Sequence, residues 1–390
     1  MTGTDRWLLP DGVEELLPAD AQRVEAMRRL LLDLYSSWGY ELIMPPMVEF
    51  TDSLLVGLGS DLDIQTFKIT DQATGRLMGI RPDITPQAAR IDAHSLHREG
   101  PVRLCYAGSV LHTKPRAISA SRAPIQVGAE LYGEPGIAAD SEVVQLMLET
   151  FVALDIGSIT LDLGHQGIVA SLMKHSGLNE ALQKEVFEAL QHKAQAAISD
   201  IGKKSGELSP TSQHLTALMD LHGGVDVIDR ARSVLAGAST EVFQALDQLQ
   251  AIADLVSERY PSVNLHFDLA ELHGYHYHTG LVFAVYHAGC GEAVANGGRY
   301  DAIGEAFGRA RPATGFNTEL KTLLGLVGTE NRAVSRKIFA PYSDRADQWL
   351  AVSELRAAGE VVICGLPEES APAECRRELV LQNDKWIVVD

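Results

Sequence analysis

The stretch AELHGYHYHTGLVF, Ala270 to Phe283, holds three histidines and two tyrosines within six residues, between apolar residues typical of strands. Such a cluster could bind a metal ion, take part in catalysis or line a small-molecule pocket. A strand would place His276 and His278 on one face and Tyr275 and Tyr277 on the other, because side chains alternate along a strand. A metal site would need further ligands, and no CxxC or HExxH pattern offers them. A pocket wall and a plain structural strand both stay open on this pattern alone.

Polar residues also lie where a strand is predicted to end. The segment FKITDQATGRLMGIRPD predicts a β-hairpin that turns at DQATG and brings Arg81 and Asp83 to a strand end. A helix is then predicted from Thr85 to His97. Asp83 taken singly, like Glu130 further along the chain, is more typical of a capping or surface carboxylate than of a ligand contact.

A second hairpin follows, with an unusually long connection. The segments VRLCYAGSVLHTK and APIQVGAELYG predict two antiparallel strands joined by a polar loop over residues 115–121. Gln126, Gly128 and Glu130 share one face of the second strand, because residues two apart in a strand point the same way.

Helical periodicity accounts for most of the other segments. A helix is predicted from an Asp20 cap to Gly39, and another from Asp140 to Leu154. Residues from about 168 to 260 are helical in pattern with no strand candidate, which predicts a helical insertion. The segment NGGRYD predicts a glycine-rich turn before a last helix near residues 320–327.

The C-terminal part has the pattern of a small separate unit. After a polar linker over residues 329–337, residues 338–390 predict strand, helix and strand, followed by a hairpin with Asn383 and Asp384 at its turn. The sequence therefore predicts a main domain over residues 1–328, with the insertion inside it, and a short α/β unit.

Composition narrows the class of protein. The 390 residues are 46% hydrophobic and 22% charged, which is typical of a globular protein. No apolar run of membrane-spanning length occurs and the four cysteines form no pairing pattern, so we expect a reducing, cytoplasmic location and no membrane partner. The net charge of −19 disfavours a long nucleic-acid footprint, because a polyanion is repelled by an acidic surface.

Four segments in order carry a family resemblance: the strand ending at Pro45, the RPDITP strand end, the pair LHTKPR and QVGAELYG, and GGRYD followed by GFNTELKTL. Together they resemble the catalytic domain of class II aminoacyl-tRNA synthetases, and most closely histidyl-tRNA synthetase, over residues 5–328. The resemblance implies an α+β fold, with an antiparallel sheet flanked by helices. It also implies an amino-acid pocket beside an ATP cleft, and a self-dimer formed near the Pro45 strand.

The cations expected in the ATP cleft are missing. Arginines of this family hold the nucleotide's phosphates, because a planar bidentate cation stabilises charge that develops during adenylate formation. At the matching position of the second motif this chain has His112, with Lys114 where an acidic residue is usual, and the third motif has Lys321 and Thr322 in place of a Glu-Arg pair. Each lost clamp costs roughly 10² to 10³ in rate. The resemblance therefore predicts no catalysis by this route and no cofactor. No metal is expected either, because the histidine cluster lacks further ligands.

The amino-acid pocket is of suitable composition. The positions that hold the ligand in histidyl-tRNA synthetase correspond to Asp83, Thr85, Gln126 and Glu130, and the histidine-reading segment falls on GYHYHTG, with Tyr275, Tyr277 and His278. A carboxylate pairs with the ligand's ammonium, and another accepts an imidazole N–H. His273 stands where a basic residue would hold the ligand's carboxylate. Arg81 or Arg122 could take over that role, and Tyr300 is a further candidate ligand contact.

This combination resembles the regulatory subunit family of ATP phosphoribosyltransferase, a non-catalytic relative of histidyl-tRNA synthetase with a shortened C-terminal domain. The resemblance implies assembly with the short catalytic subunit, four of each in a hetero-octamer. It also implies activation of that subunit and feedback inhibition by histidine. Two alternatives stay open: an active histidyl-tRNA synthetase-like ligase, and an amino-acid sensor that serves some other enzyme.

Overall fold

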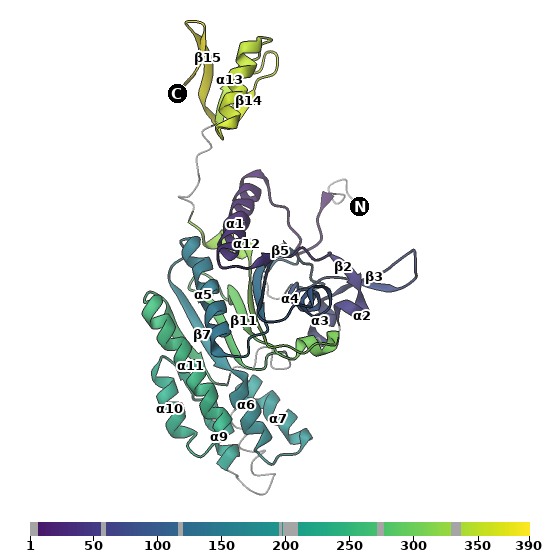
Figure 1. Cartoon of the computed structure of the whole chain (residues 1–390), viewed down its shortest axis with the longest axis vertical. Helices are drawn as coiled ribbons and strands as arrows, with labels where there is room; N and C mark the ends of the chain where they lie inside the picture. Colours follow the sequence, from purple (N-terminus) through teal and green to yellow (C-terminus); the bar gives the residue numbers. More distant parts are fainter. Residues whose placement is uncertain are drawn as a thin grey trace. The chain divides into compact units, whose positions relative to one another are not determined.

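The structure is a computed structural model of the whole chain, and it describes residues 7–55, 60–115, 120–194, 197, 210–270, 277–328 and 337–390. The chain forms two compact units, Met1–Leu326 and Val327–Asp390. Figure 1 shows a large sheet with flanking helices in the first unit. Within the described ranges, no helix is long and apolar enough to cross a membrane.

A nine-stranded sheet is the scaffold of the first unit's described residues, in the order β1-β5-β6-β12-β11-β10-β7-β9-β8. Its pairs are antiparallel except β1 with β5 and β7 with β9. The strands are β1 (Glu41–Leu42), β5 (Val102–Ser109), β6 (Ile125–Tyr132), β7 (Ile159–His165), β8 (His222–Gly223), β9 (Asn264–Asp268), β10 (Leu281–His287), β11 (Ala295–Arg299) and β12 (Ala313–Glu319). The predicted α+β fold is confirmed.

Helices cover this sheet because their apolar stripes need burial. Helix α1 (Pro18–Ser37) buries Val24, Met27, Leu31 and Tyr35, and α5 (Ile137–Ala153) packs beside it. The hydroxyls of Tyr35 and Thr150 lie 3.0 Å apart, and the Tyr35 ring meets the Phe316 ring of β12 edge to face. Helix α12 (Leu320–Leu326) follows β12 and contacts α1.

A second, three-stranded sheet is formed by residues that precede β5 in the chain. Strands β2 (Val48–Phe50), β4 (Leu77–Ile80) and β3 (Phe67–Thr70) form an antiparallel sheet in that order, with the short helices α2 (Thr51–Leu54) and α3 (Ser60–Gln65). Strand β4 leads into α4 (Thr85–Arg90), which continues as a π-helix, η2 (Ile91–Leu96). A 3₁₀ helix, η3 (Ile303–Phe307), lies between β11 and β12.

The segment between β7 and β9 is mainly helical. It contains α6 (Gln166–Lys174), α7 (Glu180–Gln191), α9 (Pro210–Leu218), α10 (Asp226–Val234) and α11 (Thr240–Arg259), which Figure 1 shows gathered beside β7. The prediction of no strand here is wrong, because β8 pairs with β9 at Gly223 and Phe267. Two residues are too few to produce a strand pattern in a sequence.

The second unit has a four-stranded sheet in the order β14-β13-β15-β16 among its described residues. Its elements are β13 (Lys337–Ala340), α13 (Ala346–Ala357), β14 (Val362–Cys364), β15 (Cys375–Gln382) and β16 (Lys385–Val389). Asn383 and Asp384 have φ angles of 49° and 61°, so the predicted hairpin turn is confirmed. Residues 329–336 of the predicted linker lie outside the described residues.

Four local predictions differ from the structure. Helix α1 begins after Leu17, so Asp20 lies inside the helix and is not its cap. Pro18 occupies the first turn, where a backbone N–H has no partner within the helix. The helix from Thr85 ends at Leu96 as a π-helix, and His97 is left-handed with φ 49°. The residues of NGGRYD up to Arg299 form β11. Tyr277 lies in a turn and His278 lies outside any helix or strand, so the predicted strand does not run through these two residues.

Candidate functional site

A buried carboxyl, Glu130, lies at the centre of the first unit's polar residues. It is 1% exposed on β6, and it accepts hydrogen bonds from the Tyr106 hydroxyl at 2.9 Å and from the Tyr300 hydroxyl. Burial, helped by the charge of Asp83, raises its pKa to about 8, although the hydroxyl donors act in the opposite direction. A carboxyl buried in this way can share a proton with a basic group of a ligand.

Glycines make the space around this carboxyl. Gly315 of β12 pairs with Glu130, and a Cβ atom at Gly315 would lie 1.6 Å from Glu130 Oε2. Gly128 is paired with Tyr106 of β5, and a Cβ there would lie 2.7 Å from the Tyr106 hydroxyl. Because Gly315 and Gly128 have no Cβ atom, they leave room for the Glu130 carboxyl and the Tyr106 hydroxyl.

A second carboxylate is held beside this group. Asp83 Oδ1 accepts the Thr85 backbone N–H at 2.9 Å and the Gln126 side-chain amide at 3.1 Å. The oxygen of the Gln126 amide accepts the Ile84 N–H at 2.9 Å, which fixes the orientation of the amide. The Thr85 hydroxyl lies 3.1 Å from that of Tyr106, so the loop before α4 is joined to the Glu130 network.

An aromatic wall completes the arrangement. The Tyr277 ring stacks on Tyr300 with 5.1 Å between centroids and meets His278 edge to face at 5.2 Å. Burial raises the pKa of Tyr277 well above its usual value, with further contributions from the charges of Glu130 and Asp83. The Tyr277 hydroxyl is buried and has no hydrogen-bond partner among the described residues. A buried hydroxyl left without a partner costs about 1 to 3 kcal/mol, and this one lies near Glu130 and Asp83, which makes it a candidate ligand contact.

The structure thus brings together six predicted site residues. These are Asp83, Thr85, Gln126, Glu130, Tyr277 and Tyr300, and His278 lies against Tyr277. His273, Tyr275 and His276 lie outside the described residues. Within those ranges, no group of three or more His, Cys, Asp or Glu side chains is arranged to hold a metal ion.

Arg81 and Arg122 are engaged mainly with backbone carbonyls. Arg81 donates to the carbonyl oxygens of Ser109 at 2.9 Å and Pro45 at 2.8 Å. Arg122 donates to those of His112 at 3.1 Å and Asp11 at 2.9 Å. Both arginines therefore hold loops of the scaffold, and a carboxylate contact by either stays a prediction.

The positions expected to hold phosphate-binding cations carry scaffold contacts. His112 is 2% exposed, with its Nε2 atom 2.9 Å from the Pro82 carbonyl oxygen. Lys321 pairs with Glu14 at 3.0 Å, and the Thr322 hydroxyl donates to Glu319 at 2.6 Å. An imidazole, an ammonium and a hydroxyl cannot supply the planar, bidentate donors of a guanidinium.

Tyr106 is a site residue that sequence reasoning missed. The spacing of 24 residues from Glu130 gives no local pattern, and Tyr106 reads as an ordinary apolar strand residue. The register of β5 and β6 places Tyr106 opposite Gly128, which is two residues before Glu130 on β6. Long connections such as residues 110–124 do not fix a register, so the sequence alone could not provide it.

Comparisons with known proteins show which family this chain resembles. The family model described as histidyl-tRNA synthetase matches residues 12–323, and the model described as ATP phosphoribosyltransferase subunit HisZ C-terminal domain matches residues 335–389. A relative from Thioalkalivibrio sulfidiphilus, named ATP phosphoribosyltransferase regulatory subunit, is 53% identical and covers 100% of both chains. One of the same name from Pseudomonas syringae pv. tomato is 51% identical, over 100% of this chain and 99% of its own.

Solved structures have the same fold. A Bacillus halodurans protein described as an ATP phosphoribosyltransferase regulatory subunit/histidyl-tRNA synthetase gives a TM-score of 0.81 at 26% identity, over 94% of each chain. Histidyl-tRNA synthetase from Nostoc gives 0.75 at 19% identity, over 97% of this chain and 92% of its own, which shows the fold alone. A chain of the ATP phosphoribosyl transferase HisG:HisZ complex from Thermotoga maritima gives 0.59 at 17% identity, over 76% of this chain and 97% of its own.

The fold and the site define a histidyl-tRNA synthetase-like protein of the class II aminoacyl-tRNA synthetase fold. Within that class, the chain belongs to the ATP phosphoribosyltransferase regulatory subunit family. The resemblance inferred from the ordered motifs is thereby confirmed.

Proposed function

We propose that this chain is a non-catalytic subunit that binds histidine in the Glu130 pocket, activates the short catalytic subunit of ATP phosphoribosyltransferase and transmits feedback inhibition. The observation that carries the proposal is the contrast between two neighbouring regions. The Glu130 pocket keeps two carboxyls and a buried tyrosine hydroxyl without a partner among the described residues. The positions for nucleotide cations hold His112 and Lys321, both in scaffold contacts.

The pocket's chemistry suits histidine in particular. Asp83 can pair with the α-ammonium, Glu130 can accept an imidazole N–H, and the Tyr277 ring offers a flat surface. Regulation then follows from linkage: histidine favours an inhibited form of the complex if it binds that form more tightly, with a coupling of about 1 to 3 kcal/mol.

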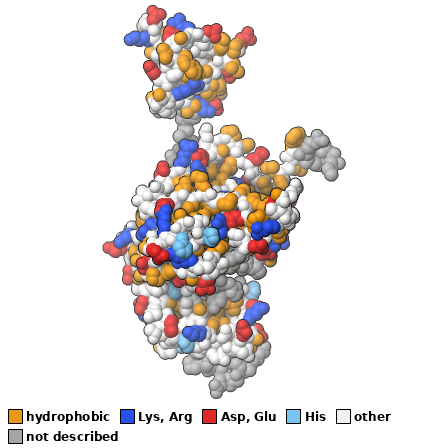
Figure 2. All heavy atoms as spheres, turned by 45° about the vertical axis from the view of Figure 1, so that its right-hand side comes forward, with side chains coloured by type: hydrophobic (Ala, Val, Ile, Leu, Met, Phe, Trp, Pro, Cys, Tyr) orange, Lys and Arg blue, Asp and Glu red, His pale blue; other side chains and the backbone are white. Residues whose placement is uncertain are grey.

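Assembly is part of the proposal. We expect a self-dimer that combines with short catalytic subunits, four of each, in a cytoplasmic hetero-octamer that binds no nucleic acid and needs no cofactor of its own in this chain. Figure 2 shows acidic and basic side chains interspersed on the face of the first unit that it presents, which gives a nucleic acid no continuous basic surface there.

The test is a titration of the short catalytic subunit with this chain, with and without histidine. We expect the transferase rate to rise to saturation as the chain is added, and to fall again when histidine is present. A rate that is unchanged by the chain would reject the activating role. Activation that histidine does not alter would reject the effector role alone.

Tyr277→Phe tests the aromatic wall. Removing a hydroxyl that has no partner among the described residues should leave the free energy of unfolding unchanged or slightly higher. Histidine affinity should fall about tenfold, because one hydrogen bond to the ligand is lost. Calorimetry and chemical denaturation measure the two effects. Lower stability with unaltered affinity would show that the hydroxyl serves the scaffold.

A further inference from the structure

Two helical segments lead away from the pocket. Helix α4 begins at Thr85 and continues into η2, and η3 begins just after Tyr300, whose carbonyl accepts the Ile303 N–H at 3.3 Å. Each segment therefore has a near end formed by a pocket residue. Their positions set the distance between Thr85 and Tyr300 across the Glu130 carboxyl.

One apolar cluster joins these segments to the aromatic wall. Ala89 of α4, Tyr300 and Ile303 are buried in it, and Tyr277 packs against it. Further apolar contacts come from Ile91, Leu96 and Phe307. Because close-packed interiors transmit small displacements, a shift of η2 against η3 would reach the pocket wall.

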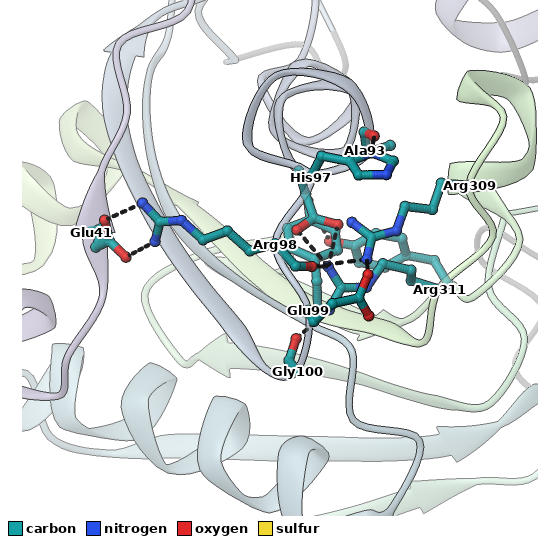
Figure 3. Close-up of polar contacts among 11 residues, drawn as sticks. Glu41, Ala93, His97, Arg98, Glu99, Gly100, Arg309 and Arg311 are labelled. Carbon is teal, nitrogen blue, oxygen red and sulfur yellow. Dashed lines mark hydrogen bonds and ion pairs between the residues drawn. The ribbon is translucent and has the colours of Figure 1, made fainter.

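Two arginines that follow η3 contact η2 and the turn after it, as Figure 3 shows. Arg311 donates to both carboxylate oxygens of Asp92 at 2.9 and 3.1 Å, to the Arg98 carbonyl oxygen at 3.0 Å and to that of Gly100. Arg309 donates to the Arg98 carbonyl oxygen and to Glu99, each at 2.9 Å. We call Asp92, Arg309, Arg311 and the carbonyls of Arg98 and Gly100 the far clamp.

The local backbone suits this clamp. His97 and Gly100 are both left-handed, with φ angles of 49° and 72°, so the turn after η2 presents its carbonyls to the arginines. Asp92 is 2% exposed. Burial raises its pKa, whereas the nearby Arg311, Arg309 and His97 act to lower it. A buried ion pair adds little net stability but fixes geometry, and π-helical turns are frequent at functional sites.

We propose that Arg309 and Arg311 are positioning residues for the pocket: by joining the chain after η3 to η2 and to the turn after η2, they set the placement of Thr85 and Tyr300 around Glu130. That the ligand so affected is histidine rests on the function proposed above. The geometric part concerns the ligand-free chain and stands on its own.

The test compares Arg309→Met and Arg311→Met with two controls in the full chain. Arg98→Met removes a cation from the same turn, but its side chain points away to Glu41 in Figure 3 and the clamp carbonyl stays. Arg103→Met removes a paired arginine, which donates to Glu142 at 2.6 and 2.7 Å and lies outside the clamp, to match the loss of stability.

Amide hydrogen exchange of the ligand-free proteins is the first measurement. Both clamp variants should exchange about tenfold faster in α4 and η3, with the controls unchanged there. Should Arg311→Met fail to fold, Arg309→Met alone decides, because its side chain is less buried, at 16% exposed against 10%. Equal exchange in clamp and control variants would overturn the inference, whether or not the chain binds histidine.

Histidine affinity is the second measurement. The clamp variants should bind histidine about tenfold more weakly, while Arg103→Met stays within twofold of the unaltered chain. Absence of histidine binding by the unaltered chain would reject the proposed function and leave the exchange result to judge the clamp. Faster exchange with unaltered affinity would overturn the positioning role.

Discussion

Glu130→Gln is expected to weaken histidine binding by roughly a hundredfold. The carboxyl holds a proton in the ligand-free chain and can pass it to the ligand's imidazole, and the resulting hydrogen bond between charged groups, which an amide cannot make, contributes about 1.5 to 3 kcal/mol. Gln has nearly the same size, and its oxygen can still accept from Tyr106 or Tyr300. Activation of the catalytic subunit should stay close to that of the unaltered chain. Calorimetry and transferase assays measure the two properties.

The same substitution should change how stability depends on pH. Burial raises the pKa of Glu130 from 4.5 to about 8, so the folded chain holds a proton that the unfolded chain releases between these values. Stability from the neutral carboxyl is therefore fully present below about pH 4.5 and is lost as the pH rises through about 8. Relative to Glu130→Gln, the unaltered chain should lose a few kcal/mol of unfolding free energy across this window.

Denaturant unfolding of both proteins at several pH values makes this comparison, because all other titrating groups are shared. A constant difference in unfolding free energy from pH 5 to 8 would show that Glu130 is ionised throughout. Equal loss of histidine inhibition and of activation would argue against a separate effector pocket.

Gly315→Ala should abolish histidine binding and destabilise the chain by about 1 to 3 kcal/mol or more. A Cβ atom would lie 1.6 Å from Glu130 Oε2 and 2.8 Å from the Ala129 carbonyl oxygen, so the carboxyl must leave its position between the tyrosines. Its displacement breaks the hydrogen bonds from Tyr106 and Tyr300. Thermal unfolding and calorimetry measure both losses.

Gly325→Ala is the matched control, because a Cβ at this exposed position of α12 meets nothing within 4 Å. Alanine should stabilise that helix by up to about 1 kcal/mol and leave histidine affinity unchanged. If Gly315→Ala bound histidine as well as this control does, Glu130 would have no part in binding.

Much of the fold could be predicted because its strands are apolar runs bounded by clear turns. The β3–β4 hairpin around DQATG and the β15–β16 turn at Asn383 and Asp384 are confirmed. The NGGRYD segment was assigned wrongly because glycine favours turns in general. In β11, Gly297 instead gives room to the Phe283 ring, which a Cβ would approach to 2.3 Å.

The four motifs that resemble histidyl-tRNA synthetase predict the site residues, whereas periodicity alone does not. Residues Asp83 and Gln126 are 43 positions apart, and only the pairing of distant segments brings their side chains within 3.1 Å. The positions of Tyr106 and Gly315 depend on strand register. The far clamp depends on the directions of the backbone carbonyls after η2. Neither property is encoded in a local pattern, because both are decided by tertiary packing.

The replacement of phosphate-binding arginines in this chain is consistent with its membership of the regulatory subunit family. A synthetase must neutralise phosphate charge as the adenylate forms, and His112, buried against the Pro82 carbonyl, offers no bidentate guanidinium for that task. A subunit that only senses histidine needs the amino-acid pocket and no such charge. We therefore expect selection on this chain to act through binding and assembly.

The most direct measurement of the central claim is histidine-dependent exchange between ATP and pyrophosphate by the purified chain, made at a histidine concentration that calorimetry shows to be saturating. The account predicts bound histidine and no exchange above background. Robust exchange would contradict it, because the chain would then form the adenylate and would be a ligase.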